Sequence, residues 1–290
     1  SKHSSKIFWL SKETSILFNN WFMMYFLSVV LIGTIYPIFL DVISAEKISV
    51  GPPFYQNLIA PFLIPFLLFM SIGPKLNWIK SKVKNVFSYI VLFIFSIFLS
   101  FFILKKINVD FLINTILISS AFYLFLMTAK DIFMKNFKNY SQIIAHLGFS
   151  LFILSILFNN ILSTEIITNI KIGEKFDFKK GEIFFEKLEK STKDNYDSLV
   201  GSFKISDKKG NTVNLRPELR IYNQPVIITS EADIKTNIFT DKFLVMNNVK
   251  GKEYFNIRYQ TKPFMIWIWI STLLLVFGGV LSLFNRNYEK

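Results

Sequence analysis

Six long runs of mostly apolar residues limit what this chain of 290 residues can fold into. An α-helix needs about 20 such residues to cross roughly 30 Å of hydrocarbon, so the runs predict a polytopic α-helical membrane protein. The hydrophobic content of 52% and the 34 phenylalanines agree with this class, because a soluble domain of this size would not carry so many uninterrupted apolar stretches. The predicted spans cover residues 20–41, 57–74, 85–104, 108–129, 142–162 and 264–284.

Basic residues in the short segments between these runs predict the orientation of the helices. One set of segments, with both chain ends, carries Lys2, Lys6, Lys12, Lys75, Lys80, Lys82, Lys84, Lys130, Lys135, Lys138, Arg286 and Lys290. The opposite set carries Lys47, Lys105 and Lys106. Because Lys and Arg accumulate on the inner side, both ends are expected in the cytosol of a bacterium, or in the matrix if the membrane is the mitochondrial inner membrane.

The segment between the fifth and sixth spans has a different pattern. Polar and apolar residues alternate in EIFFEKLEK and EYFNIRYQ, and SFKISDKKGNTVNL predicts two strands around an Asp-Lys-Lys-Gly turn. A small, mostly antiparallel β domain on the outer side is therefore expected over residues 163–262, between a membrane region over 1–162 and a final helix and tail over 263–290. This domain carries 18 Lys and Arg against 14 Asp and Glu, spread along its length, which is typical of a solvated surface and does not indicate nucleic-acid binding.

His146 is the main candidate site residue. It lies in IIAHLGFSLFIL, about one turn or roughly 6 Å from the cytosolic end of its predicted span. An ionisable residue inside a bilayer is costly and is by default a functional candidate. Burial favours the neutral ring, whose free nitrogen lone pair can bind a metal such as haem iron or accept a hydrogen bond from a Ser or Thr of a neighbouring helix. The residues alone leave both interpretations open. Gly148 could likewise leave room for a flat cofactor or serve simple helix packing.

Other candidates are weaker. In residues 48–57, Gly51-Pro52-Pro53 is expected to exclude a helix and to form a rigid turn beside the interfacial rings of Phe54 and Tyr55, or to line a docking surface. Trp267 and Trp269 are expected to anchor the last span at the interface. Arg216 and Arg220 could clamp haem propionates or an acidic partner, although surface salt bridges are the commoner role. Asp110 and Asp131 lie at span edges, and the near absence of charge in the middle of the spans argues against a proton-coupled transporter. The absence of cysteine excludes any thiolate from this chain.

Several stretches together resemble the C-terminal part of CcmF, the large membrane subunit of the System I cytochrome c maturation haem lyase. In order, they are LSKETSILFNN, GTIYPIFLDVISAEKISVGPPFYQNLIAPFLIPFLLFMSIGPKLNW, IIAHLGFSLFILSI, NLRPELRIY, TSEADIKTNIFTDKFLVM and IRYQTKPFMIWIWISTLLLVFGGVLSLFNR. The resemblance spans nearly the whole chain. One departure is TSEADI, where Asp233 introduces a charge at a position that is usually apolar in the family.

The resemblance implies a part of an enzyme that takes haem from a CcmE-like chaperone and attaches it, with CcmH/CcmI-like subunits, to apocytochrome c. It also implies an internal b-type haem that is expected to reduce the incoming haem, with His146 as one axial ligand of its iron. The family's other haem-binding residues lie upstream of the positions present here, so we expect the chain to need the N-terminal part of CcmF and to be inactive alone, whether it is a natural split subunit or a truncated piece. The alternative is a non-catalytic membrane scaffold whose outer domain docks partners.

Overall fold

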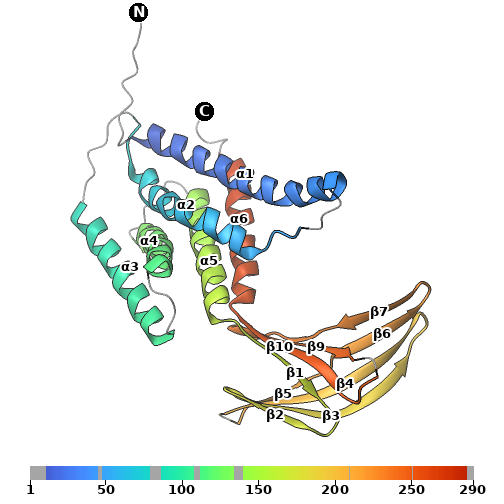
Figure 1. Cartoon of the computed structure of the whole chain (residues 1–290). Coiled ribbons are helices and arrows are strands. Elements are labelled where there is room, and N and C mark those ends of the chain that lie inside the picture. Colours follow the sequence, from blue (N-terminus) through green and yellow to red (C-terminus); the bar gives the residue numbers. More distant parts are fainter. Residues whose placement is uncertain are drawn as a thin grey trace, which may run out of the picture. The chain divides into compact units, whose positions relative to one another are not determined.

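The structure is a computed structural model that describes residues 11–44, 48–78, 86–107, 112–133, 140–208, 210–249 and 251–285 (Figure 1). His3, Asp110 and most of the loop lysines used to predict the orientation lie outside these residues. The described chain divides into two compact units. A helical unit contains the residues up to Leu154 and from Ile270 onward, and a mainly β unit contains Ser155–Trp269.

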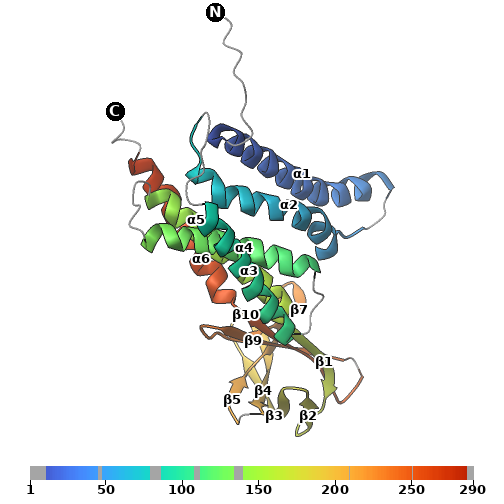
Figure 2. The same ribbon diagram turned by 90° about the vertical axis from the view of Figure 1, so that its left-hand side faces the viewer.

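Six helices in the described part of the chain are long and apolar enough to cross a membrane, which confirms the predicted fold class. They are α1 (Lys12–Ser44), α2 (Pro52–Ile72), α3 (Val86–Ile107), α4 (Leu112–Phe133), α5 (Tyr140–Leu162) and α6 (Met265–Asn285). A short 3₁₀ turn, η1 (Gly73–Lys75), follows α2 directly. Within the helical unit, α1 packs on α2, α2 on α4 and α4 on α3 (Figure 2).

The start of α2 corrects one expectation. Gly51-Pro52-Pro53 was expected to exclude a helix, but α2 begins at Pro52, with Gly51 in an extended conformation before it. The expectation was wrong because the first turn of a helix needs no backbone N–H donors, and the fixed φ of proline suits that turn. The two prolines therefore start the helix instead of preventing it.

Several Ser and Thr hydroxyls in the helical unit donate to backbone carbonyls of their own helices. Ser71 Oγ donates to the Leu67 carbonyl at 2.7 Å, and Thr128 Oγ1 donates to the Leu124 carbonyl at 2.8 Å. Hydrocarbon offers no water to satisfy such groups, so these local bonds let polar side chains remain inside the bundle.

Two antiparallel sheets form the β unit, as predicted from the alternating pattern. The first has the strand order β1-β10-β9-β8; the second has the order β2-β3-β4-β6-β7, with β5 paired to β4. The strands are β1 (Thr164–Ile170), β2 (Lys175–Phe178), β3 (Gly181–Thr192), β4 (Tyr196–Asp207), β5 (Thr212–Leu215), β6 (Glu218–Asn223), β7 (Val226–Glu231), β8 (Asp233–Lys235), β9 (Thr240–Asn248) and β10 (Phe255–Pro263). Buried side chains of both sheets meet in one core that includes Phe185, Phe203, Leu244 and Ile257.

The first and last strands of this unit are neighbours. β1 and β10 pair from Thr164 opposite Thr261 to Ile170 opposite Phe255. Since β1 follows α5 after one residue and β10 precedes α6 by one residue, the chain enters and leaves the β unit side by side. The predicted hairpin is also present: β4 and β5 pair around a turn in which the backbone N–H of Asn211 donates to Asp207 Oδ1 at 3.0 Å, and Gly210 has a φ of +84°.

Candidate functional site

His146 lies on α5 at a point where several elements of the helical unit meet. The helix begins at Tyr140, two residues before the predicted span, so His146 is six residues, or about 9 Å, from its first residue. This end of α5 is built from the polar residues Tyr140, Ser141 and Gln142, after which the sequence is apolar except for His146 and a few hydroxyls and amides. The imidazole is therefore held near one end of the span.

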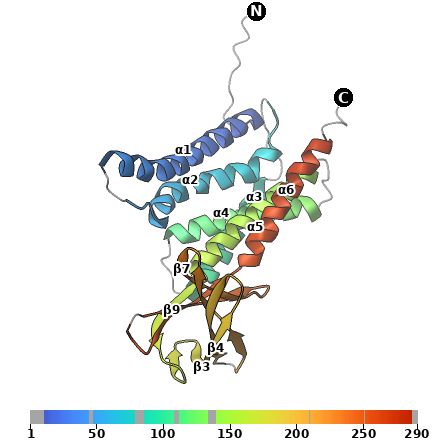
Figure 3. The same cartoon turned by 90° about the vertical axis from the view of Figure 1, so that its right-hand side faces the viewer.

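The opposite face of α5 packs tightly on α6 (Figure 3). A Cβ atom placed on Gly148 would lie 2.9 Å from the backbone nitrogen of Leu275, and one on Gly278 would lie 2.7 Å from the backbone nitrogen of Ala145. Only glycine allows backbones this close, as is common between membrane helices. Gly148 thus serves helix packing, one of its two expected roles. Because residues two apart on a helix point about 200° apart, His146 faces away from α6.

On its own face, His146 lines a cavity of about 240 Å³. The other lining residues come from the start of α1, the end of α2, η1 and α5: Lys12, Ser15, Ile16, Asn19, Phe69, Met70, Gly73, Pro74 and Gln142. Gly73 lets η1 approach α1, since a Cβ there would lie 2.2 Å from Ser15 Oγ. The cavity therefore combines one imidazole, one ammonium group and several amide and hydroxyl groups with aromatic and aliphatic side chains.

A second, smaller cavity of about 40 Å³ lies on another side of the same ring. It is lined by His146, Gln142, Pro74 and residues of α4 that include Asp131. Asp131 receives hydrogen bonds from Lys75 Nζ at 2.5 and 2.6 Å through its two carboxylate oxygens. The two side chains are only 14% and 28% exposed, so this ion pair ties η1 to α4 in a largely dehydrated place beside the histidine.

No hydrogen bond of the His146 ring is found among the described residues. Two hydroxyls that line the small cavity, those of Ser71 and Thr128, donate to carbonyls of their own helices. The interpretation in which His146 holds the bundle together through a Ser or Thr thus finds no such partner in this part of the chain. The ring is partly exposed, toward the cavities.

The two arginines singled out from the sequence lie in the β unit and form salt bridges. Arg216 Nη2 donates to Glu189 Oε2 at 3.0 Å, and Arg220 Nε donates to Glu218 Oε2 at 3.0 Å. The hydrogen bond from Lys187 lowers the pKa of Glu189, and the hydrogen bond to Glu218 raises the pKa of Arg220. Each guanidinium already has a carboxylate partner, which favours the salt-bridge interpretation over a clamp for propionates.

The remaining candidates also have structural explanations. Phe54 and Tyr55 pack on α1 at Gly33, where a Cβ would lie 2.7 Å from the Tyr55 hydroxyl, so they join two helices. Trp269 is 66% exposed, whereas Trp267 Nε1 is buried with no hydrogen-bond partner among the described residues. Asp233 Oδ2 accepts the backbone N–H of Arg216 at 2.6 Å, which gives this unusual charge a structural role.

Sequence reasoning missed the pairing of Lys75 with Asp131. Lys75 was interpreted as a topology signal and Asp131 as a residue at the edge of a span. Neither interpretation considered that the two side chains could form an ion pair. The usable signal was that both lie at the same predicted end of their spans, where a lone carboxylate in a poorly hydrated place needs a cation.

Comparison with known proteins agrees with the resemblance described above. The family model described as CcmF C-terminal beta-sandwich matches residues 161–263. The cytochrome c-type biogenesis protein CcmF of Escherichia coli is 26% identical over 97% of this chain and 45% of its own length, and NrfE of Haemophilus influenzae is 23% identical over 100% and 47%. A solved structure described as cytochrome c heme lyase CcmF has the same fold, with a TM-score of 0.70 at 18% identity over 95% of this chain and 46% of that chain.

The six apolar helices and the β-sandwich define a multi-pass membrane protein with one β domain inserted before its last helix. The chain is homologous to the C-terminal part of the CcmF-type cytochrome c biogenesis proteins. It spans about half the length of the curated relatives that it matches.

Proposed function

We propose that this chain is the C-terminal part of a membrane haem lyase that attaches haem covalently to apocytochrome c. In this proposal His146 supplies one axial ligand to the iron of an internal b-type haem. The observation that carries the proposal is the position of His146 on the face of α5 that points away from α6, at the wall of a cavity of about 240 Å³ and without a hydrogen-bond partner among the described residues.

The residues around the cavity are suited to supply one of the two axial ligands of a haem iron. A neutral imidazole is a common axial ligand of haem iron. Among the described residues there is no group of three or more His, Cys, Asp or Glu side chains that could hold a metal ion, so an iron bound to His146 would need a porphyrin and a ligand from elsewhere. The same cavity is also lined by Lys12, Asn19 and Gln142, which could bind the propionates of a haem. A bound haem would supply one-electron chemistry.

The proposed topology places both chain ends on the inner side of the membrane and the β domain on the outer side. The support for it is the charge difference between the two sets of loops. In that orientation His146 lies near the inner end of α5, whereas attachment to apocytochrome c is expected outside. The internal haem would then be suited to passing electrons toward the incoming haem. The proposed partners are a CcmE-like chaperone, CcmH/CcmI-like subunits, apocytochrome c and the N-terminal part of the lyase.

A difference spectrum tests this proposal. The chain is purified with and without a co-expressed N-terminal part of a CcmF-type protein, and reduced-minus-oxidised absorption is recorded. A b-type band is expected only with both parts present, and His146→Ala is expected to abolish most of it.

His3→Ala is the matched control, because His3 is the only other histidine of the chain. It is expected to leave the band unchanged. A full band with His146→Ala would remove the ligand assignment. If no band appears with either combination of parts, the scaffold interpretation is favoured.

A further inference from the structure

The β unit includes the first residues of a predicted membrane span, which indicate where the membrane boundary lies. The candidate membrane span in α6 covers Met265–Phe284. Its 20 residues, at 1.5 Å each, give about 30 Å, which is the thickness of the hydrocarbon core of a bilayer. Met265 is therefore expected close to one boundary. The end of α5 lies at the same level, since Asn159 Nδ2 donates to the Pro263 carbonyl at 2.6 Å and the rings of Phe158 and Phe264 are 5.6 Å apart.

One loop of the sandwich is hydrogen-bonded to Phe264, the residue before this span. Thr236, Asn237, Ile238 and Phe239 connect β8 to β9. The backbone N–H of Phe264 donates to the Phe239 carbonyl at 2.9 Å, and Thr240 pairs with Pro263 in the ladder. Phe239 is therefore at the level of the residue that precedes the span.

The two apolar side chains at the tip of this loop are not covered by the β unit. Ile238 is 58% exposed and Phe239 is 63% exposed. Exposing large apolar side chains to water costs free energy, about 25 cal/mol per Å² of surface that could be buried. At the level of a membrane boundary, such side chains can instead enter the region between headgroups and acyl chains.

Lysines surround the base of the loop. Lys235 and Lys242 are directly paired across β8 and β9, and Lys262 Nζ lies 5.5 Å from the centre of the Phe243 ring. Lys242 is three residues from Phe239, about 10 Å along an extended strand, and a lysine side chain can reach back toward the headgroups. Asp241 stands opposite Lys262 and offsets one of the three positive charges.

We propose that the β8–β9 loop is a lipid-binding site. Ile238 and Phe239 insert at the membrane interface, and the ammonium groups of Lys235, Lys242 and Lys262 bind the phosphates of anionic lipid headgroups. Lipid is the occupant that the observations favour, because the loop is hydrogen-bonded to the residue that precedes a span and its charge is complementary to anionic headgroups. The contact would fix the β domain against the bilayer at a point other than its two connecting helices.

Single-cysteine labelling tests the insertion, and the absence of native cysteine makes every introduced thiol unique. Phe239→Cys and, as a control, Asp194→Cys in the β3–β4 turn are labelled with an environment-sensitive fluorophore in the full chain. The proteins are reconstituted with their N-terminal part in vesicles of phosphatidylcholine and phosphatidylglycerol. The label at position 239 is expected to be quenched by nitroxide-bearing lipid and to be about threefold or more less accessible to iodide than the label at 194.

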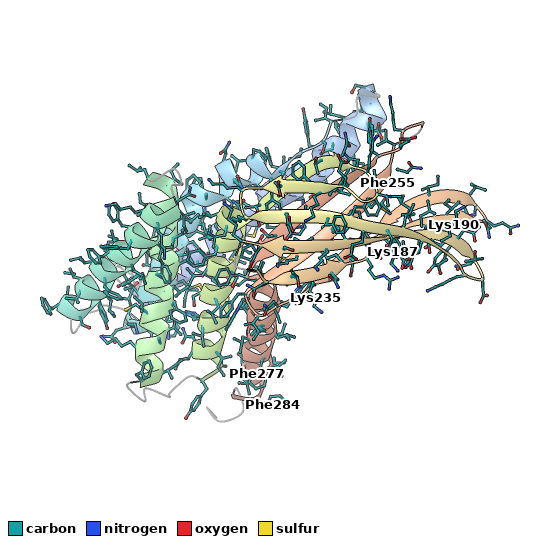
Figure 4. The ribbon with its side chains drawn as sticks, turned by 90° about the horizontal axis from the view of Figure 1, so that it is seen from below. Lys187, Lys190, Lys235, Phe255, Phe277 and Phe284 are labelled. Atoms are coloured by element: carbon teal, nitrogen blue, oxygen red, sulfur yellow. The ribbon has the colours of Figure 1, made fainter. Side chains whose placement is uncertain are left out.

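The charge requirement is tested in the same vesicles. Lys235→Glu with Lys242→Glu is expected to raise iodide access at position 239 toward that of position 194, whereas Lys190→Glu, on β3 of the other sheet and well away from Lys235 in Figure 4, is expected to leave it unchanged. Equal iodide access at positions 239 and 194 would overturn the proposal. Protection from both iodide and lipid nitroxide would also overturn it, because it would show that another polypeptide covers the loop.

Discussion

Adjacent glycines on α6 provide a test of how tightly α5 and α6 pack. A Cβ at Gly278 would lie 2.7 Å from the Ala145 nitrogen and 3.0 Å from its Cα and Cβ, whereas a Cβ at Gly279 would meet nothing within 4 Å. Both positions lie inside the same helix, so Gly→Ala gains about the same helix propensity at each, up to about 1 kcal/mol. The difference between the two variants therefore isolates the packing cost.

That cost can be estimated from the distances. Carbon–nitrogen contacts below about 3.4 Å are repulsive, and the atoms that Gly278→Ala would meet belong mainly to backbone that no side-chain rotation can move. Overpacking of this kind costs about 1–3 kcal/mol. Gly278→Ala is thus expected to be less stable than Gly279→Ala by about 1–3 kcal/mol, with Gly279→Ala equal to or slightly more stable than the parent.

The assay is reversible unfolding of the full chain in mixed micelles, followed by tryptophan fluorescence, with both variants and the parent measured under one set of conditions. Equal unfolding free energies for the two variants would refute the close approach of α5 and α6, and with it the argument that fixes the direction of His146. A loss at Gly279→Ala alone would refute it as well.

Two further predictions concern charged and titrating groups. Asp131→Asn leaves the Lys75 ammonium without its carboxylate and is expected to destabilise the helical unit by about 1–3 kcal/mol, less than a fully buried pair because both groups are partly exposed. In a double-mutant cycle with Lys75→Met, the double variant Lys75→Met with Asp131→Asn is expected to recover most of this loss, and additive losses of the two single variants would contradict the pairing. Burial raises the pKa of Tyr259 to about 12. Since the raised pKa favours the neutral phenol in the folded state, its contribution of roughly 2–3 kcal/mol is complete below pH 10 and is lost as the pH rises toward 12. Tyr259→Phe should flatten stability across that interval, and a phenolate absorbance difference between the parent and Tyr259→Phe that titrates near pH 10 would count against the shift.

The class of fold could be predicted because it depends on patterns that extend over many residues. Six apolar runs and one alternating segment each contain enough positions to identify a helix or a strand, and the described part of the chain has six such helices and an antiparallel sandwich. The start of α2 was misjudged because Pro52 and Pro53 were read as breakers, whereas their effect depends on position within a helix.

The surroundings of His146 could be predicted only in part. The histidine itself stands out in its sequence, but the cavity beside it is formed by residues from distant segments, such as Lys12 and Gly73. Likewise, the sequence offers two uses for Gly148, and only the distance to the α6 backbone selects packing. Contacts of this kind depend on which helices are neighbours, and apolar periodicity carries little of that information because lipid and protein are similar surroundings for an apolar side chain.

The direction of His146 bears on what kind of partner it has. A histidine that only strengthened the contact of α5 with α6 would be expected on the face of Gly148, where the two backbones meet. His146 is on the other face, beside cavities and without a hydrogen-bond partner among the described residues. A polar group kept in such a place is costly unless something else satisfies it. The proposed haem and a side chain outside the described part of the chain differ as partners in one respect: an iron ligand changes an absorption spectrum, whereas a hydrogen bond to another side chain does not.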